Sequence, residues 1–548
     1  MKKFLVIPFM LLCASLVAQT GGFSITAVGD VSPVLIDNVT KISDPAVKKD
    51  TVLPAPSFDY TLQPKKFMTS VQIDTIKAAK LGNESVPKLY NTYARLGVGN
   101  YATITGEFYA NSTRSKTSAW GFHARHFSAG KGPGDVQGDF SGFGQQQVDA
   151  FGKYFFRHHT LTGGLDYDRH AVYNYGSDVA GNSFTKDFTK QTFNYWGANV
   201  DLLSHLPDSS DINHHGNLRY YHLSDRYKVK EDNLLFSANG GTYLRGQMLN
   251  VDLGVDYNHV TGAQDTVNST ILHVTPMIRS RGNKFDASIG IAVYGDLGAE
   301  SFTYFYPQAS FSYDIVNHII VPYVTLGGYL ERNSMRTMTD INPFLMTTEA
   351  YALKNTQHKY ELSGGLKGSI SSEIVYDLRA TRVELDNMPF FVNTIESQDI
   401  FRNKFAAVYD NVDLVQAHAQ LGWQHFEKVR LDLSGDYYHY TMTNELHPWH
   451  TPTLRLGLLA EYNLQDKLIG RMDVCYLDGM YARMQNGSGY SVVNLKGLVD
   501  VNLGFEYRYT KFFSVFLNLN NLANQRYERW YAYPTQRFNF LAGATYTF

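Results

Sequence analysis

The chain has 548 residues, and its 49 Lys plus Arg nearly balance its 51 Asp plus Glu, for a formal net charge of -2 at pH 7. This balance gives no strong electrostatic field and no reason to expect a nucleic-acid partner. The 38 Tyr, 34 Phe and 45 Gly make the chain rich in strand formers and turn residues. The mean hydropathy of -0.27 is too polar for a helical membrane protein. Such a composition is typical of a membrane β-barrel with a hydrated lumen.

The N-terminus predicts export. Two lysines precede the apolar run 4–16, and small and polar residues follow around Ala18. This order predicts a cleaved signal peptide over residues 1–18, and the run is shorter than the roughly 20 residues that a membrane-spanning helix needs. After cleavage Cys475 is the only cysteine, so we expect no internal disulfide. The predicted location is the cell outer membrane.

The next segment, residues 19–89, is mixed in composition and punctuated by proline. It predicts an irregular stretch that lies in the periplasm or in the lumen. Its short β-prone run 24–28 could pair with a periplasmic energising protein by strand addition, as any such pentapeptide could. From residue 90 to residue 548 no compositional break marks a linker, so we expect one continuous architecture.

Strict alternation of apolar and polar residues dominates this region. The last segment places six apolar residues on one face: Phe538, Phe540, Ala542, Ala544, Tyr546 and Phe548. The same period of two recurs in the segments 249–258, 429–437, 454–461 and 499–508. A period of two predicts β-strands that each have one apolar and one polar face.

Strand length and turn spacing predict a membrane barrel in place of a soluble sandwich. Many alternating segments run roughly 11 to 16 residues, whereas about 5 or 6 is usual in globular domains. Their polar faces carry Asp, Glu and Arg in mid-strand, which lumen water tolerates and two packed sheets do not. Short connections are expected at 157–159, 245–247, 281–284, 316–318, 427–428, 465–467 and 509–511, and long ones at 130–145, 173–186, 335–355, 386–410, 484–491 and 523–536. The chain is therefore predicted to be all-β, a transmembrane antiparallel barrel of about 22 strands over residues 90–548, with short turns in the periplasm.

Charged residues on the polar faces of neighbouring late strands are candidates for the lumen lining. They are Arg430, Asp432, Asp436, Arg455, Glu461, Arg471, Asp473, Asp500, Glu506 and Arg508. They could form a polar wall that selects a solute. The alternative is that they only neutralise one another, as charges in any hydrated lumen do.

Other polar residues do not form the patterns that metal binding or catalysis requires. Asp135 and Asp139 lack the ligand ladder of a calcium loop. The pairs His158-His159 and His214-His215 are expected on periplasmic turns, where neighbouring residues point to opposite faces and do not easily share a metal ion. No hydrolase or zinc-protease motif is present, so we expect no enzyme activity, metal or cofactor. The apolar segments 343–346 and 388–392 in predicted outer loops could form a binding surface or pack on each other.

Two motifs carry a family resemblance. The C-terminal hairpin, with Leu517-Asn518-Leu519-Asn520-Asn521-Leu522, Gln525-Arg526-Tyr527, Tyr533-Pro534 and a closing Phe548, resembles the barrel end of TonB-dependent receptors. The segment Tyr93-Ala94-Arg95-Leu96-Gly97-Val98-Gly99-Asn100-Tyr101 resembles the first barrel strands of a receptor-like group from Bacteroidota that lacks a typical plug. The resemblance implies that Phe540, Tyr546 and Phe548 form the assembly signal that the barrel-insertion machinery reads.

The chain departs from those receptors in one respect. Its segment before residue 90 is too short for the plug domain that fills their barrels. The resemblance therefore implies passage of a solute across the outer membrane, either energised from the periplasm or passive. The alternative function is a structural barrel subunit of an outer-membrane complex. Expected partners are outer-membrane lipid, the insertion machinery, and a periplasmic energising protein or a surface lipoprotein.

Overall fold

The structure is a computed structural model that describes residues 89–133, 141–176, 186–206, 211–262, 265–298, 300–348, 353–393, 403–486 and 489–548. The predicted signal peptide, almost all of segment 19–89, and Asp135 and Asp139 lie outside the described residues. In the part of the chain that the structure describes, no helix is long and apolar enough to cross a membrane.

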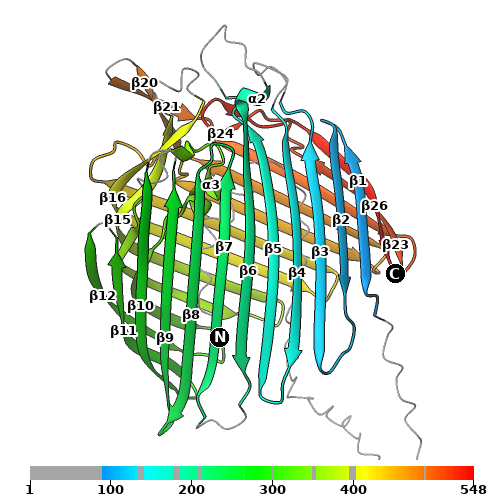
Figure 1. Cartoon of the computed structure of the whole chain (residues 1–548). Helices are drawn as coiled ribbons and strands as arrows, with labels where there is room; N and C mark the ends of the chain where they lie inside the picture. The colour runs from blue at the N-terminus through cyan, green and yellow to red at the C-terminus, as the bar shows by residue number, and fades with distance from the viewer. Residues whose placement is uncertain are drawn as a thin grey trace, which may run out of the picture. The chain divides into compact units, whose positions relative to one another are not determined.

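Twenty-two antiparallel strands form a single sheet that closes on itself as a barrel (Figure 1). Their bounds are β1 Thr92–Gly99, β2 Thr103–Asn111, β3 Ser118–Ala129, β4 Phe143–Phe155, β5 His159–Tyr173, β6 Lys190–Ser204, β7 Asn213–Asp225, β8 Lys230–Leu244, β9 Gln247–Thr261, β10 Thr266–Arg281, β11 Phe285–Leu297, β12 Ser301–Tyr313, β13 Val321–Glu331, β14 Thr356–Ser369, β15 Ile374–Asn393, β16 Phe405–His425, β17 Val429–Met442, β18 Leu454–Leu464, β19 Leu468–Asp478, β22 Leu498–Arg508, β23 Phe513–Asn520 and β26 Asn539–Thr547. The predicted all-β barrel and its strand number are confirmed.

Several short elements are not part of the sheet that forms the barrel wall. They are the helices α2 (Lys186–Thr189) and α3 (Met335–Ile341), the hairpin of β20 (Met480–Asn486) and β21 (Gly489–Leu495), and the pair β24 (Glu528–Trp530) and β25 (Tyr533–Pro534). All of them lie at one end of the barrel, at the top in Figure 1. We call this the loop end and the opposite end, where the short connections lie, the turn end. The seven predicted short connections all join consecutive strands of the wall.

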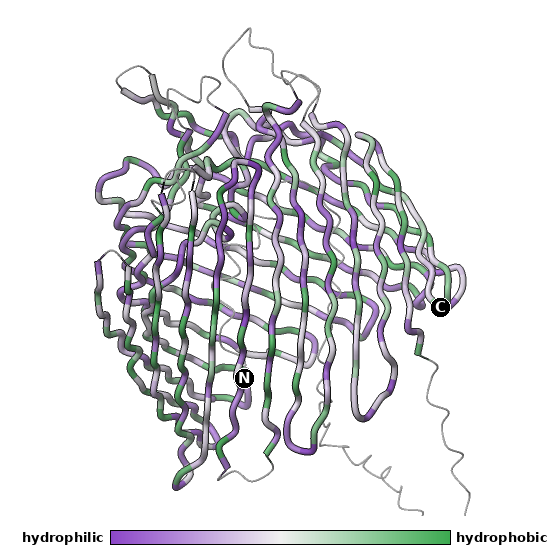
Figure 2. Tube along the Cα trace, in the orientation of Figure 1, coloured by the Kyte–Doolittle hydropathy of each residue, from purple (hydrophilic) through white to green (hydrophobic). Residues whose placement is uncertain are grey.

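The two faces of the strands differ as the alternation predicts. Along β9, Val251, Leu253 and Tyr257 expose 40%, 43% and 40% of their surface to the outside of the barrel, and the polar residues between them are less exposed. The tube in Figure 2 changes between apolar and polar colours from residue to residue along the strands. An apolar outer face and a polar inner face are what a barrel in a bilayer requires.

The first and last strands close the barrel by a tight contact. Gly97 of β1 is in register with Gly543 of β26. A Cβ atom on Gly543 would lie 2.0 Å from the carbonyl oxygen of Leu96, so only glycine fits at this position. The backbones of Thr92 and Phe548 also exchange hydrogen bonds of 3.1 and 3.0 Å. The C-terminal residue therefore takes part in barrel closure.

Three local predictions were wrong. Residues 386–393 and 405–410 were expected in a loop, yet they extend β15 and β16, because this stretch pairs with itself (Phe390 with Val408) beyond a bulge after Leu385. The expected loop 484–491 lies within the β20–β21 hairpin. His214 and His215 lie in β7 and not in a turn. In each case the pairing runs further than the local turn residues indicate.

Candidate functional site: the loop cap

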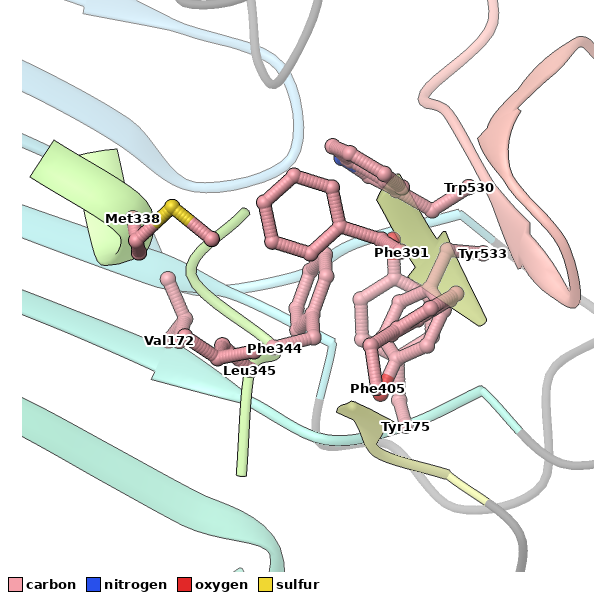
Figure 3. Close-up of a cluster of buried hydrophobic side chains, with 9 residues drawn as sticks. All are labelled: Val172, Tyr175, Met338, Phe344, Leu345, Phe391, Phe405, Trp530 and Tyr533. Atoms are coloured by element: carbon pink, nitrogen blue, oxygen red, sulfur yellow. The ribbon is translucent and has the colours of Figure 1, made fainter. Parts of the chain in front are cut away.

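A buried hydrophobic cluster joins loops at the loop end of the barrel. Its members are Val172, Tyr175, Met338, Phe344, Leu345, Phe391, Phe405, Trp530 and Tyr533 (Figure 3). They come from the end of β5, the β13–β14 connection, the facing ends of β15 and β16, and the β23–β26 connection. We call the loop residues and strand ends that meet here (174–176, 332–348, 388–393, 403–408, 443–453 and 521–538) the loop cap. Since these strands stand far apart in the closed sheet, the loops converge across the barrel's loop end.

Aromatic rings and hydrogen bonds hold the loops of the cap together. Tyr533 stacks on Phe344 with ring centroids 3.8 Å apart and lies 4.9 Å from the ring of Tyr175. The Tyr175 hydroxyl donates to the carbonyl of Pro534 at 3.0 Å, and the Tyr533 hydroxyl donates to the carbonyl of Asn403. Aromatic pairs add to the stabilisation that area burial gives. The cap is thus a packed hydrophobic core that loops and strand ends form together.

The segment around α3 fastens the cap to the barrel wall on the side of β7–β9. Ser334 begins the helix with a capping box, in which its side chain accepts from the Thr337 backbone. The buried carboxylate of Glu231 accepts from the backbone N–H of Met335 at the helix N-terminus, where negative charge is favoured. Arg332 donates to the Asp256 carboxylate at 2.8 Å. These bonds hold the helix against β8 and β9, whereas the helix itself lies in the connection between β13 and β14.

Thr347 and Arg336 add two further contacts to the same wall. The Thr347 hydroxyl donates to the carboxylate of Asp225 at the end of β7. The Arg336 guanidinium lies 3.8 Å from the ring centroid of Tyr195 on β6. Segment 332–347 is therefore attached at both ends and along its length.

Two basic residues are buried inside the cap. Arg529 donates from Nη1 to the carbonyl of His450, and its guanidinium lies 4.8 Å from the ring centroid of Trp530. Burial, followed by repulsion from Arg455, lowers the pKa of Arg529 to about 10, so the guanidinium stays charged at neutral pH. This charge is retained within a hydrophobic cluster, which is unusual because burying a cation is costly.

The hydrogen bonds of His450 require its neutral form. Nδ1 donates to the carbonyl of Phe391 at 2.9 Å, and Nε2 accepts from the backbone N–H of Tyr531 at 3.2 Å. An imidazole with one donor and one acceptor nitrogen is uncharged. Burial lowers the pKa of His450 to about 3, which agrees with this geometry. His450 thereby links the β15, β17 and β23 sides of the cap.

The predicted lumen-lining charges lie on four adjacent strands, β17, β18, β19 and β22. Arg430 is in register with Glu461, which is in register with Arg471. The ion pairs are Arg430 with Asp432 at 2.6 Å, Arg471 with Glu461 at 3.8 Å and Arg508 with Glu506 at 3.4 Å. The structure therefore brings much of the predicted set together as neighbours on one wall.

The remaining members of the predicted set have other surroundings. Asp436 accepts from the side chains of Gln416 at 3.1 Å and His418 at 2.7 Å. Asp500 accepts from the hydroxyl of Tyr527, a cap residue, at 3.2 Å. Arg455 is buried in register with Asp436, and Asp473 is in register with Asn502. Whether any of these charges selects a solute remains a prediction.

The cap contains segments that the sequence indicated and two buried residues that it did not, Arg529 and His450. Both apolar segments for which binding and self-packing were the alternatives contribute to this cluster, through Phe344 and Phe391, each 5% exposed. Phe390 and Val392 of the second segment belong to another buried cluster, with residues of β15–β17. Arg529 and His450 carried no recognisable signal, because a basic residue in a polar loop is normally solvated. The aromatic density around Trp449 and Trp530 was the one available hint.

The described residues contain no group of three or more His, Cys, Asp or Glu side chains that could hold a metal ion. The histidine pairs at the turn end are not part of any such group among the described residues. His215 contacts the carboxylate of Asp201, and His159 lies 5.3 Å from His214 between ring centroids.

Comparison with known proteins gives matches by structure. No protein-family model matches the sequence, and no curated protein matches it. The FrpB iron transporter of Neisseria meningitidis is 9% identical with a TM-score of 0.67, over 84% of this chain and 82% of that one. The ferric-catecholate import receptor Fiu of E. coli K12 is 10% identical with a TM-score of 0.62, over 84% and 82%. The outer-membrane ferripyoverdine receptor of Pseudomonas aeruginosa is 12% identical with a TM-score of 0.60, over 84% and 72%. The chain therefore has the barrel fold of the TonB-dependent receptors that its sequence resembles.

Proposed function

We propose that the chain is an outer-membrane transport barrel whose outer mouth is closed by its own loop cap and opens to admit a solute. The observation that carries the proposal is the convergence of loops after β5, β13, β15 and β23 into one packed cluster. A barrel of 22 strands encloses a lumen that would leak if it stayed open, so some closure is needed. The loop end faces the outside of the cell, because bacterial barrels keep their short turns in the periplasm.

The similar structures support the transport role. The proteins of matching fold are described as an iron transporter, an import receptor and a ferripyoverdine receptor. A periplasmic energising partner acting on the N-terminal segment would supply the work of opening. The solute then passes the charged wall of β17–β19 and β22, where exchangeable ion pairs offer both signs of charge.

A second candidate function is a structural subunit of an outer-membrane complex. It is favoured by apolar side chains exposed on and near the β20–β21 hairpin, where Leu446 is 60%, Tyr490 49% and Val492 38% exposed. Exposed apolar groups on a projecting element suit a protein partner. In this case the lumen would stay closed permanently.

The test is single-channel conductance in planar bilayers. The intact mature barrel is compared with a Phe344→Ala/Tyr533→Ala variant, and each is made with and without residues 20–88. We expect the intact protein to be silent and the combined cap variant and truncation to conduct strongly. If the cap variant never conducts with either N-terminus, the cap is not the gate and the structural role is favoured.

The N-terminal deletion separates two closures. Conductance that appears with the deletion alone would show that segment 20–88 closes the lumen and that the cap does not. Folding of each variant is checked by its heat-modifiable migration on gels. A matched control is Tyr437→Ala, which removes a tyrosine that is 53% exposed on the outer face of β17.

A further inference from the structure

The strands β12 and β13 are paired over only part of their length. These strands pair at four positions, from Ser312 with Tyr323 to Ala309 with Leu326. Closer to the loop end, residues 301–308 pair only with β11 and residues 327–331 only with β14, in a stretch that the structure describes completely. We call these two unpaired edges the β12–β13 seam. Unpaired backbone in a barrel wall is costly in lipid.

Two irregularities lie at the level of the wall where the β12–β13 pairing ends. Pro307 has no N–H to give to a neighbouring strand. On the other side of the gap, the register of β13 with β14 shifts between Gly327 and Tyr329, because β14 carries one extra residue there as a bulge. The side chain of Gln308 donates to the Gly328 carbonyl at 2.7 Å in place of a backbone bond. The interruption therefore coincides with a proline on β12 and with a bulge in the β13–β14 pairing.

Aromatic rings line the lumen side of the seam. Phe302, Tyr304 and Tyr306 form a ladder with centroids 6.2 and 6.1 Å apart along β12. A Cβ atom on Gly328 would lie 2.8 Å from Cδ1 of Tyr306, so this ring rests against the bulge and fills the seam from inside. On the outer side Phe305 is 65% exposed. An apolar molecule would meet aromatic surface on both sides of the wall.

Polar atoms without partners lie beside this aromatic surface. Tyr329 stacks on His358 with centroids 4.0 Å apart. The Tyr329 hydroxyl and Nδ1 of His358 are buried and make no hydrogen bond within the described part of the chain. His358 uses its other nitrogen to bond Glu331 at 3.1 Å. Buried polar atoms are normally satisfied, so two unsatisfied atoms on a pair of stacked rings indicate a place for a polar group that is absent from the chain itself.

We propose that the β12–β13 seam is a lateral portal through which a lipid-like amphiphile passes between the lumen and the outer leaflet. Its acyl chain packs on the Phe302–Tyr306 ladder, and its polar head hydrogen-bonds Tyr329 and His358. Tyr306 is the gate, because its ring fills the seam when no lipid is present. Sideways exit into the bilayer suits only a molecule that dissolves there, which excludes a water-soluble solute. This portal extends the proposed transport function and rests on it only for the direction of net movement.

The test uses photolabelling in proteoliposomes, with a palmitate that carries a diazirine at the end of its chain as the probe. Two cysteine pairs are made in a Cys475→Ser background and bridged with a bis-maleimide. The first is Phe305→Cys/Leu330→Cys, at positions that face each other if the β12–β13 register is continued. The control, Val293→Cys/Phe305→Cys, bridges β11 and β12, where pairing is already complete. Labelled residues are identified by mass spectrometry.

We expect the uncrosslinked protein to be labelled on lumen-facing residues of β12–β14, and bridging the seam to reduce this labelling at least tenfold while the control bridge leaves it unchanged. Tyr306→Ala should increase the labelling several-fold, whereas Tyr109→Ala, at the lumen side of the fully paired β2–β3 contact, should not. Labelling confined to outward-facing residues, or equal with both bridges, would overturn the portal. Labelling needs no transport, so failure of the transport proposal would appear separately, in the conductance experiment.

Discussion

The ring of Phe344, from the connection between β13 and β14, stacks on the ring of Tyr533, from the connection between β23 and β26, with centroids 3.8 Å apart. This contact bridges loops from distant parts of the barrel wall. Both rings are buried, at 5% and 3% exposure. Their pairing identifies the loop cap as a cooperative unit, and its energetics can be tested separately from those of the barrel.

Removing Tyr533 should loosen the cap without unfolding the barrel. Tyr533→Ala deletes a buried ring, which costs about 3 to 5 kcal/mol. Tyr533→Phe keeps the ring and removes the hydroxyl with its bond to Asn403, which should cost about 1 kcal/mol. Hydrogen exchange of the backbone amides in 403–408 and 527–535 measures the local opening. Equal exchange in both variants would contradict the cooperative cap, and Tyr437→Ala is the neutral control.

The Glu231 carboxylate should be essential for docking of α3. It is fully buried and accepts from the Tyr221 hydroxyl and from the Met335 backbone N–H. Glu231→Ala leaves both donors buried without an acceptor, which should destabilise the docked helix by about 3 kcal/mol. Glu231→Gln keeps one acceptor oxygen and should cost less. Protease cleavage within 332–348 is the measurement, and resistance in both variants would show that the bond does not fasten the helix.

Mild acid should open the cap through His450. Its pKa is about 3 when buried, against 6.5 when exposed, so the open form binds a proton that the closed form excludes. The stabilisation of the closed form is complete above pH 6.5 and falls by about 1.4 kcal/mol per pH unit from pH 6.5 towards pH 3. The charged group that faces His450 is Arg529, a cation that opposes protonation further.

Exchange of the amides in 527–535 between pH 7.5 and pH 4.5 measures this effect. In His450→Gln the side chain keeps a donor for Phe391 and an acceptor for Tyr531 but does not titrate, so the acid-induced opening should largely disappear. An unchanged pH profile in this variant would assign the effect to other groups.

The lumen charges should set ion selectivity once the cap is open. Arg471 pairs with Glu461 at 3.8 Å, and both side chains are partly exposed, at 26% and 37%. In the Phe344→Ala/Tyr533→Ala background without residues 20–88, Arg471→Glu should shift the reversal potential in a salt gradient towards cation selectivity. Its effect on stability should be within about 1 kcal/mol, as for other solvated ion pairs. The charge swap Arg471→Glu/Glu461→Arg should restore the original selectivity, and a reversal potential that does not move would exclude this wall from the ion path.

The terminal residue should matter more for assembly than for the finished barrel. Phe548 is 54% exposed on the outer face, while its backbone bonds Thr92. Phe548→Ser keeps the backbone bonds and removes the aromatic group that the resemblance assigns to the insertion signal. We expect several-fold less folded barrel in the outer membrane of cells. Phe505→Ser, at an outward position 41% exposed on β22, is the control, and equal losses would indicate a general effect of polar residues on the lipid face.

The barrel could be predicted from the sequence because the alternation of apolar and polar residues within each strand identifies its outer and inner faces. The alternation from Leu249 to Tyr257 is local, and antiparallel strands joined by short turns pair with their chain neighbours. The strand ends at 386–393 could not be predicted, since they depend on the facing segment 405–410 and on a surface in the cap. The candidate lumen-lining charges could be grouped from the sequence because they share the polar faces of strands that are adjacent in the sheet.

The sequence alone therefore determined the fold, the strand number and the outward apolar face, which follow from periodicity along the chain. The tertiary structure decided which loops pack together at the loop end and where the strand pairing of the wall is incomplete. Phe344 and Tyr533 meet only because the closed sheet brings their loops together, and the buried state of Arg529 and His450 exists only within that contact. The β12–β13 seam likewise depends on Pro307 of β12 and the bulge in the β13–β14 pairing lying at the same level of the wall, which is a property of register and not of one strand by itself.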